Sequence, residues 1–155
     1  MAIRQICVSE VTNLTTDYAE TITCTNPGHT PTAAGDDCNI HVYNVGLNLN
    51  TTPPTLSFSF DSQFQYKFHD DSCATFNDYC NVMGSTGSIT LPTGVTLCCD
   101  GAISPEIQAS ASCDAGQITT TETSVSGPVS LAFTITNLCA PTIICVEDTD
   151  CLNNG

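Results

Sequence analysis

The chain has 155 residues, a length typical of one domain, and 41% of them are hydrophobic, which is enough for a folded core. It carries 16 acidic and only 2 basic residues, for a formal net charge of −14. This balance excludes nucleic acid and anionic membrane surfaces as partners, because both bind clusters of Lys and Arg. No apolar run approaches the roughly 20 residues of a membrane-spanning helix.

The N-terminal region predicts an arm followed by a single domain. Residues 1–15 are expected to form a short arm or connector, since chain ends are the segments least committed to a core. Residues 16–155 then make one β-sandwich domain. A loop is predicted over 25–38, where Asn26-Pro27-Gly28 is a strong turn signal. Residues 40–50 alternate between apolar and polar side chains, which indicates a strand.

The clearest predicted strand covers residues 56–68, where apolar and polar positions alternate with a period of two. Odd positions carry Ser, Gln and Lys. Even positions carry the apolar residues Leu56, Phe58, Phe60, Phe64, Tyr66 and Phe68. Such a period is typical of a half-buried strand or a bulged pair of strands, with the even face in the core.

The remainder of the chain predicts short strands separated by turns. We expect a loop with one short helical turn over 69–87, a hairpin formed by strands at 87–91 and 95–99, irregular chain over 100–116, a Thr-rich strand over 117–126, a turn at Gly127-Pro128, and strands at 129–136 and 141–147. In the strand at 129–136, Val129, Leu131, Phe133 and Ile135 lie on one face. No segment has a helical period. Seven to nine short strands, spaced about ten residues apart, favour an all-β fold: an antiparallel, jelly-roll-like β-sandwich with an N-terminal arm.

Eleven cysteines predict a disulfide-rich protein from an oxidising compartment. Because the number is odd, at least one thiol has no partner within the chain, and we expect it to bond to another chain; an inert buried thiol is the alternative. The expected intersubunit candidates are Cys7, Cys98, Cys99, Cys145 and Cys151. The expected structural candidates are Cys24, Cys38, Cys73, Cys80, Cys113 and Cys139.

Other residue patterns give no catalytic, cofactor-binding or metal site. The histidines His29, His41 and His69 lack the spacing of metal ligands, and no Cys-x-x-Cys pair is present. No Gly-x-Ser-x-Gly motif occurs, and a Cys73–His69 pair would be disabled by oxidation. The acidic pairs are Asp36-Asp37, Asp70-Asp71, and Asp148 with Asp150. They are predicted to be solvated surface, with Ca²⁺ in these loops as a secondary expectation. The chain is therefore not expected to be an enzyme.

These features favour a structural subunit that assembles with copies of itself into an extracellular or cell-surface filament. An arm can add a strand to the sheet edge of a neighbour, and head-to-tail addition does not close on itself. Cys7 would then bond to a neighbouring subunit, or else to Cys24 or another cysteine of its own chain. The first ten residues show no secretory signal, so the chain is expected outside the cell without one. A virus capsid or decoration protein and a monomeric secreted binding domain are the alternatives.

The layout resembles the subunits of endospore appendages, the pilus-like fibres of Bacillus spores. The resemblance lies in Cys7 within a short arm, the Cys98-Cys99 doublet, and Cys145 and Cys151 near the end. It implies jelly-roll-like subunits on the spore surface, without a signal peptide, whose N-terminal connectors bond through cysteines to neighbouring subunits. Those connectors carry a paired-cysteine motif, whereas this arm has only Cys7.

Overall fold

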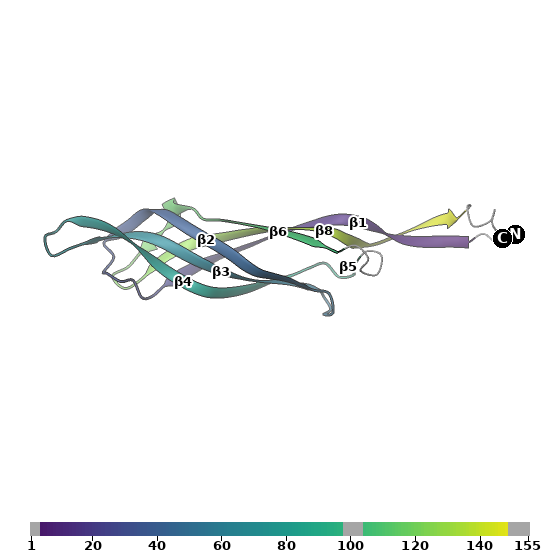
Figure 1. Ribbon diagram of the computed structural model, residues 1–155, viewed down its shortest axis with the longest axis horizontal. Helices are drawn as coiled ribbons and strands as arrows, with labels where there is room; N and C mark the ends of the chain where they lie inside the picture. Colours follow the sequence, from purple (N-terminus) through teal and green to yellow (C-terminus); the bar gives the residue numbers. More distant parts are fainter. Residues whose placement is uncertain (1–3, 98–103, 149–155) are drawn as a thin grey trace.

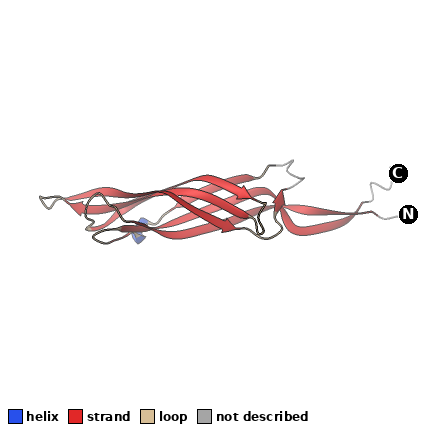
Figure 2. Cartoon of the chain, turned by 90° about the horizontal axis from the view of Figure 1, so that it is seen from below, coloured by secondary structure: helices blue, strands red, loops and turns tan. Residues whose placement is uncertain are grey.

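The structure is a computed structural model that describes residues 4–97 and 104–148, with side chains over 13–96 and 104–139. Its described part is almost entirely strand, so the all-β prediction is confirmed (Figure 2). The strands are β1 (Arg4–Cys24), β2 (Ala33–Asn48), β3 (Thr55–His69), β4 (Thr75–Thr90), β5 (Thr96–Leu97), β6 (Glu106–Ser112), β7 (Thr119–Thr120) and β8 (Val125–Asp148). One turn of 3-10 helix covers Ala115–Gln117.

The strands form two antiparallel sheets that pack against each other (Figure 1). The three-stranded sheet has the order β2-β3-β4. In the five-stranded sheet β8 is central: β1 pairs with one side of it, and β5, β6 and β7 follow one another along its other side. The two central strands, β3 and β8, therefore carry the inner faces that make the core.

The predicted even face of β3 is confirmed as the core. Leu56, Phe60, Phe64 and Tyr66 are fully buried, and Phe58 is nearly so. The facing residues of β8 are the predicted Val129, Leu131, Phe133 and Ile135, together with Val125. Burying each large side chain contributes roughly 2–3 kcal/mol of hydrophobic stabilisation.

Two disulfides join the sheets, one along each side of the sandwich. Cys24 at the end of β1 bonds to Cys80 of β4, and Cys38 of β2 bonds to Cys113 directly after β6. In the three-stranded sheet, Cys38 and Cys80 are both register partners of Phe64. The two bridges therefore lie on either side of one buried aromatic ring and hold the edges of the sheets together at the same level.

The loop predicted over 69–87 is wrong, because most of it belongs to β4. The turn is confined to residues 70–74, after which β4 pairs with β3 from Thr75 to Thr90. The polar composition of this segment had indicated a loop. However, β4 is an edge strand of its sheet and is largely exposed, so it does not need alternating apolar residues.

The turn predicted at Gly127-Pro128 is also wrong, because β8 runs straight through it. On the side away from β1, the pairing of β7 ends at Ser126 and that of β6 begins at Ser130. Pro128 falls in the gap between them, which is where a strand tolerates a residue without an N–H group.

Three smaller predictions also need correction. The segments 87–91 and 95–99 do not form a hairpin, since β4 lies in one sheet and β5 in the other. The stretch expected to be irregular contains β6, and the strand expected over 117–126 shrinks to β7 followed by a turn. The loop after Cys24 is shorter than predicted, because β2 already begins at Ala33.

Beyond the sandwich, β1 and β8 continue as a two-stranded ribbon. The last residue of β8 that pairs with a third strand is Cys139, opposite Thr96 of β5. Past a register shift, residues 4–9 and 143–148 pair only with each other among the strands that the structure describes. Figure 1 shows this ribbon projecting from the body toward both termini, and Figure 2 shows it from a second side. Residues 4–9 with 143–148 are called the ribbon below.

Candidate functional site

The two ends of the elongated molecule differ in chemistry. The ribbon occupies one end, and the other end carries the β1–β2 loop, the β3–β4 turn and the β7–β8 turn (Figure 1). We call this second end the distal end; it consists of residues 25–32, 68–78 and 121–124. The candidate functional residues of the described chain lie mainly at these two ends.

A shallow polar hollow of about 600 Å³ opens at the distal end. Its walls are residues 25–30, His69 of β3, and Glu122 with Thr123 from the β7–β8 turn. The fold thus brings together His29 and His69, which the sequence left apart. His41 lies elsewhere and stacks on Tyr43. Among the described residues, no three His, Cys, Asp or Glu side chains are placed to hold a metal ion.

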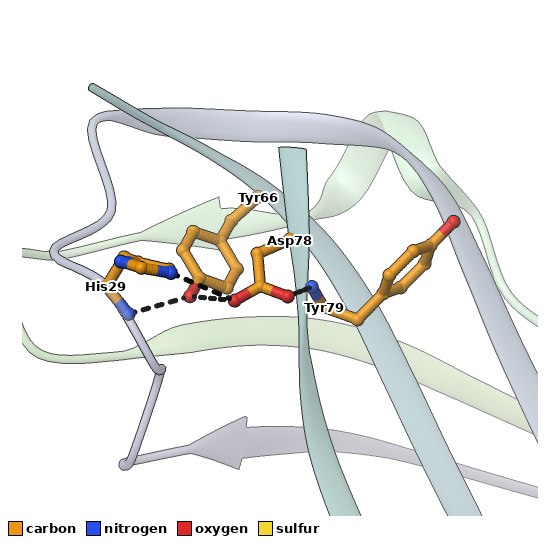
Figure 3. Close-up of polar contacts among 4 residues, drawn as sticks. All are labelled: His29, Tyr66, Asp78 and Tyr79. Carbon is orange, nitrogen blue, oxygen red and sulfur yellow. Dashed lines mark hydrogen bonds and ion pairs between the residues drawn. The ribbon is translucent and has the colours of Figure 1, made fainter. Parts of the chain in front are cut away.

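His29 is fixed at the rim of this hollow by a buried tyrosine and an aspartate (Figure 3). The backbone N–H of His29 donates to the Tyr66 hydroxyl at 3.0 Å, and that hydroxyl donates to Oδ2 of Asp78 at 3.1 Å. The His29 Nε2 atom lies 3.8 Å from the same Asp78 oxygen, and the backbone N–H of Tyr79 donates to Oδ1 at 2.8 Å. Burial raises the pKa of Tyr66, so its hydroxyl stays protonated as the donor to Asp78. The cluster ties the β1–β2 loop to β3 and β4.

An aromatic surface lies beside this clamp. The His29 ring stacks on Phe68 with centroids 3.9 Å apart, and Phe68 lies 5.9 Å from the ring of Phe76. Phe76 is 48% exposed and Phe68 is only half-buried. We call His29, Phe68 and Phe76 the distal aromatic patch.

The patch is uncovered because one sheet is shorter than the other at this end. The five-stranded sheet stops at Cys24, whose disulfide partner is Cys80. Phe76 lies four residues further along β4, about 13 Å at the usual rise of a strand. The inner face of β3 and β4 therefore extends past the sheet that covers it elsewhere. For the same reason Phe68, predicted to be core, is only half-buried.

A tight turn presents one free thiol at the distal end. Oδ1 of Asp70 accepts from the Ser72 hydroxyl at 2.7 Å and from the backbone N–H groups of Ser72 and Ala74, each at 2.9 Å. The hydrogen bonds from Ser72 and Ala74 hold the pKa of Asp70 below its usual value. Cys73 has φ of 63° in this turn and is exposed and unpaired. It was expected among the structural disulfides, but the turn carries it beyond the layer in which the two sheets face each other.

The remaining cysteines fall into three groups. Cys24, Cys38, Cys80 and Cys113 form the two disulfides, and Cys139 is also disulfide-bonded. Cys7 and Cys145 are directly opposite in the register of the ribbon, and their side chains lie outside the described ones. Cys98, Cys99 and Cys151 lie outside the described residues altogether.

Every tyrosine of the chain donates a hydrogen bond to a carboxylate, a pattern that the sequence did not reveal. Besides Tyr66, the pairs are Tyr43 with Asp61 at 3.0 Å, Tyr79 with Asp37 at 2.6 Å, and Tyr18 with Glu20. Only the last pair has a local signal, since residues two apart on a strand share a face. The Tyr43 and Tyr66 pairs join neighbouring strands, and Tyr79 of β4 reaches across β3 to Asp37 of β2.

Some carboxylates of the acidic pairs, which were predicted to be solvated surface, interact with other groups of the chain. Asp36 lies 3.7 Å from the Lys67 ammonium, and Asp37 accepts from Tyr79. Asp70 organises its own turn, Asp148 lies in the ribbon, and Asp150 lies outside the described residues. Ca²⁺ binding in these loops stays a prediction.

No family model, curated protein or solved structure matches the chain. Over the residues that are described, no helix has the length and apolar character needed to cross a membrane. The disulfides indicate an oxidising environment.

Proposed function

We propose that this protein is a structural subunit that assembles with copies of itself into a disulfide-stabilised extracellular filament or surface appendage. The observation that carries the proposal is the ribbon, in which residues 4–9 and 143–148 pair with each other and with no third described strand. A two-stranded antiparallel ribbon is marginally stable in water by itself. A ribbon that leaves its own core is therefore best explained by a partner that covers it.

The sequence of the ribbon fits this role. In its register, Ile6 is opposite Val146 and Val8 is opposite Ile144. These positions alternate with more polar pairs such as Gln5 and Glu147, so the register places the four β-branched aliphatic residues on one face. Among the described strands, none pairs with the outer edges of these two, and edges with unpaired backbone N–H and C=O groups are templates for strand addition.

The disulfide part of the proposal leaves two routes open for Cys7. In the first route, the arm of residues 1–15 of a jelly-roll-like subunit carries Cys7 to a neighbour. Cys7 then bonds to Cys98, Cys99, Cys145 or Cys151 of that neighbour. Its register position opposite Cys145 favours a bond within the same ribbon, because directly opposed strand residues have Cα separations within the range of a disulfide. In that case Cys7 staples the ribbon, and assembly rests on its apolar face.

The net charge of −14 opposes association of identical subunits. We therefore expect assembly to increase as salt rises from about 0.01 M to 0.15 M, where the Debye length falls from about 30 Å to about 8 Å. Apolar contacts are much less affected by this screening.

The test is electron microscopy of the purified protein, combined with SDS electrophoresis with and without reductant. Wild type is expected to form filaments. If Cys7 bonds to a neighbouring subunit, the unreduced sample should give a ladder of bands on the SDS gel that collapses to the monomer band on reduction. Val8→Asp should abolish filaments, because it places a charge on the apolar face of the ribbon. Thr15→Asp is the matched control, since Thr15 is an exposed residue of the same strand within the body.

The alternatives give different outcomes in the same experiment. A wild-type protein that stays monomeric at every salt concentration contradicts the filament and supports the secreted binding domain. Closed particles in place of filaments support the capsid alternative.

A further inference from the structure

We propose that the outer face of the three-stranded sheet binds a neutral polysaccharide chain. The site is a hollow of about 190 Å³ on strands β2, β3 and β4, which Figure 1 shows side by side. We call it the outer hollow, and its walls are Asn39, His41, Asp61, Gln63 and Met83. These residues belong neither to the ribbon nor to the distal end. One copy of the chain carries the whole site, so binding does not depend on assembly.

The register of the sheet explains why these side chains meet. The even positions of β3 are buried in the core, so Asp61 and Gln63 lie on the outer face. His41 is opposite Asp61, while Asn39 and Asn81 are opposite Gln63 on its two sides. Directly opposed residues share a face of the sheet. Three side-chain amides therefore stand in one row across the sheet, next to an imidazole and a carboxylate.

Asp61 is held in place by the chain through one of its two oxygens. Its Oδ1 atom accepts from the Tyr43 hydroxyl at 3.0 Å and from the backbone N–H of Gly84 at 2.7 Å. Both bonds reach the same oxygen, so Oδ2 is the acceptor that is left for a ligand. The amides of Asn39 and Gln63 both donate and accept hydrogen bonds. A fixed acceptor beside such amides matches sugar hydroxyl groups, each of which also donates and accepts.

Apolar surfaces flank these polar groups. Met83 is 67% exposed and Tyr79 is 37% exposed, and they are two of the three exposed large hydrophobic side chains among the described residues. The rings of His41 and Tyr43 stack with their centroids 5.5 Å apart. A sugar ring has C–H groups on its faces besides the hydroxyl groups on its rim, and these C–H groups pack on the electron-rich face of an aromatic ring. The outer face thus provides both kinds of contact that a sugar makes.

The spacing of the tyrosines favours a chain of sugars over a single sugar. Tyr43 is opposite Ser59 and Tyr79 is opposite Gln65, so the outer hollow lies between the two tyrosines along β3. Their levels are six residues of strand apart, about 20 Å at the usual rise. A ligand that contacts both tyrosines is therefore extended, as a polysaccharide is.

Charge favours a neutral chain. The net charge of −14 repels acidic polysaccharides. The outer hollow holds one carboxylate, whereas a cationic ligand would find two together at Asp70-Asp71. A peptide is usually bound along a strand edge or as a helix in a groove, and this site is instead the face of a sheet. A neutral ligand with many hydroxyl groups is the one that fits the residues of this face.

The test is a glycan array of neutral, acidic and amine-bearing polysaccharides, probed with fluorescently labelled protein. Wild type is expected to bind neutral members, and added salt should leave this binding unchanged, because screening acts on charges. Calorimetry with the best-bound member then compares variants. Gln63→Ala should weaken binding by about tenfold, because it removes the central amide of the row. Gln108→Ala is the matched control, since it makes the same change at an exposed residue of β6 in the other sheet, and it should bind as wild type does.

Three outcomes would overturn the proposal. The first is a wild-type protein that binds no member of the array, or that prefers acidic or amine-bearing members. The second is wild-type affinity in both Gln63→Ala and His41→Ala, which would place binding elsewhere on the molecule. The third is a loss of filaments in Gln63→Ala when wild type binds no glycan, which would assign this face to a contact between copies. Each of these outcomes leaves the proposed filament intact, because wild type still assembles.

Discussion

The ring of Phe64 on β3 packs directly on the backbone of Gly127 on β8. A Cβ atom at Gly127 would lie 2.4 Å from two carbon atoms of that ring, closer than real side chains approach. Phe64 is also the register partner of both Cys38 and Cys80, so the closest approach of the two sheets coincides with the level of the disulfides.

Gly127→Ala is expected to destabilise the fold by about 1–3 kcal/mol, the usual cost of overpacking a core. The added methyl group must displace the Phe64 ring, which is held by strands on both sides. Chemical denaturation measures the free energy of unfolding. Gly46→Ala is the matched control, because a Cβ there meets only the Ser57 hydroxyl at an ordinary 3.5 Å. Equal effects at the two glycines would contradict the packing account.

Ser62→Ala is expected to be neutral or stabilising by up to about 1 kcal/mol. The hydroxyl of Ser62 is fully buried on the even face of β3 and has no hydrogen-bond partner. Removing an unsatisfied polar atom removes its desolvation penalty. On the same face, Phe60→Ala should cost about 3–5 kcal/mol in the same denaturation experiment, because it leaves a cavity. A loss of more than 1 kcal/mol in Ser62→Ala would show that its hydroxyl is satisfied.

Removal of either of the two disulfides that join the sheets, as a pair of serines, is expected to cost about 2–4 kcal/mol. The bridges close segments of 56 and 75 residues, so the two costs should be similar, since the entropy of loop closure grows only slowly with length. Calorimetry of Cys24→Ser with Cys80→Ser, and of Cys38→Ser with Cys113→Ser, checks this. As control, Cys73→Ser should leave the melting temperature almost unchanged, because that thiol is free. A large fall in the melting temperature of Cys73→Ser would contradict the assignment of Cys73 as a free thiol.

The four tyrosines should ionise at higher pH in the folded protein than in the unfolded chain. The hydrogen bond to Glu20 raises the pKa of Tyr18 to about 12; burial raises the pKa of Tyr66, and the hydrogen bonds to Asp61 and Asp37 raise those of Tyr43 and Tyr79. The folded state therefore holds protons that the unfolded chain releases near pH 10. The stabilisation is complete below about pH 10 and is lost as pH rises through the folded pKa values.

Ultraviolet absorbance of tyrosinate, followed in native and denatured protein, measures this difference. Native and denatured titration curves that coincide would contradict the four tyrosine–carboxylate pairs. Tyr66→Phe should remove one of the shifted groups. It should also free the β1–β2 loop, which hydrogen exchange at the His29 amide detects.

The sequence alone determined the all-β class, the core faces of β3 and β8, and the presence of disulfides. Each rests on a local pattern: alternation between Leu56 and Tyr66, alternation between Val129 and Ile135, and the cysteine content. A strand with one buried face must repeat every second residue, so its core can be read without knowing its partners.

Only the tertiary structure decided which strands lie at edges and which ends stay uncovered. β4 was mistaken for a loop because an edge strand draws its stability from pairing with β3, a contact that its own residues do not encode. Pro128 was mistaken for a turn because its position is permitted only by the gap between β6 and β7. The distal aromatic patch was hidden for the same reason. Phe68 follows the core pattern, and it is only half-buried because the opposite sheet ends sooner.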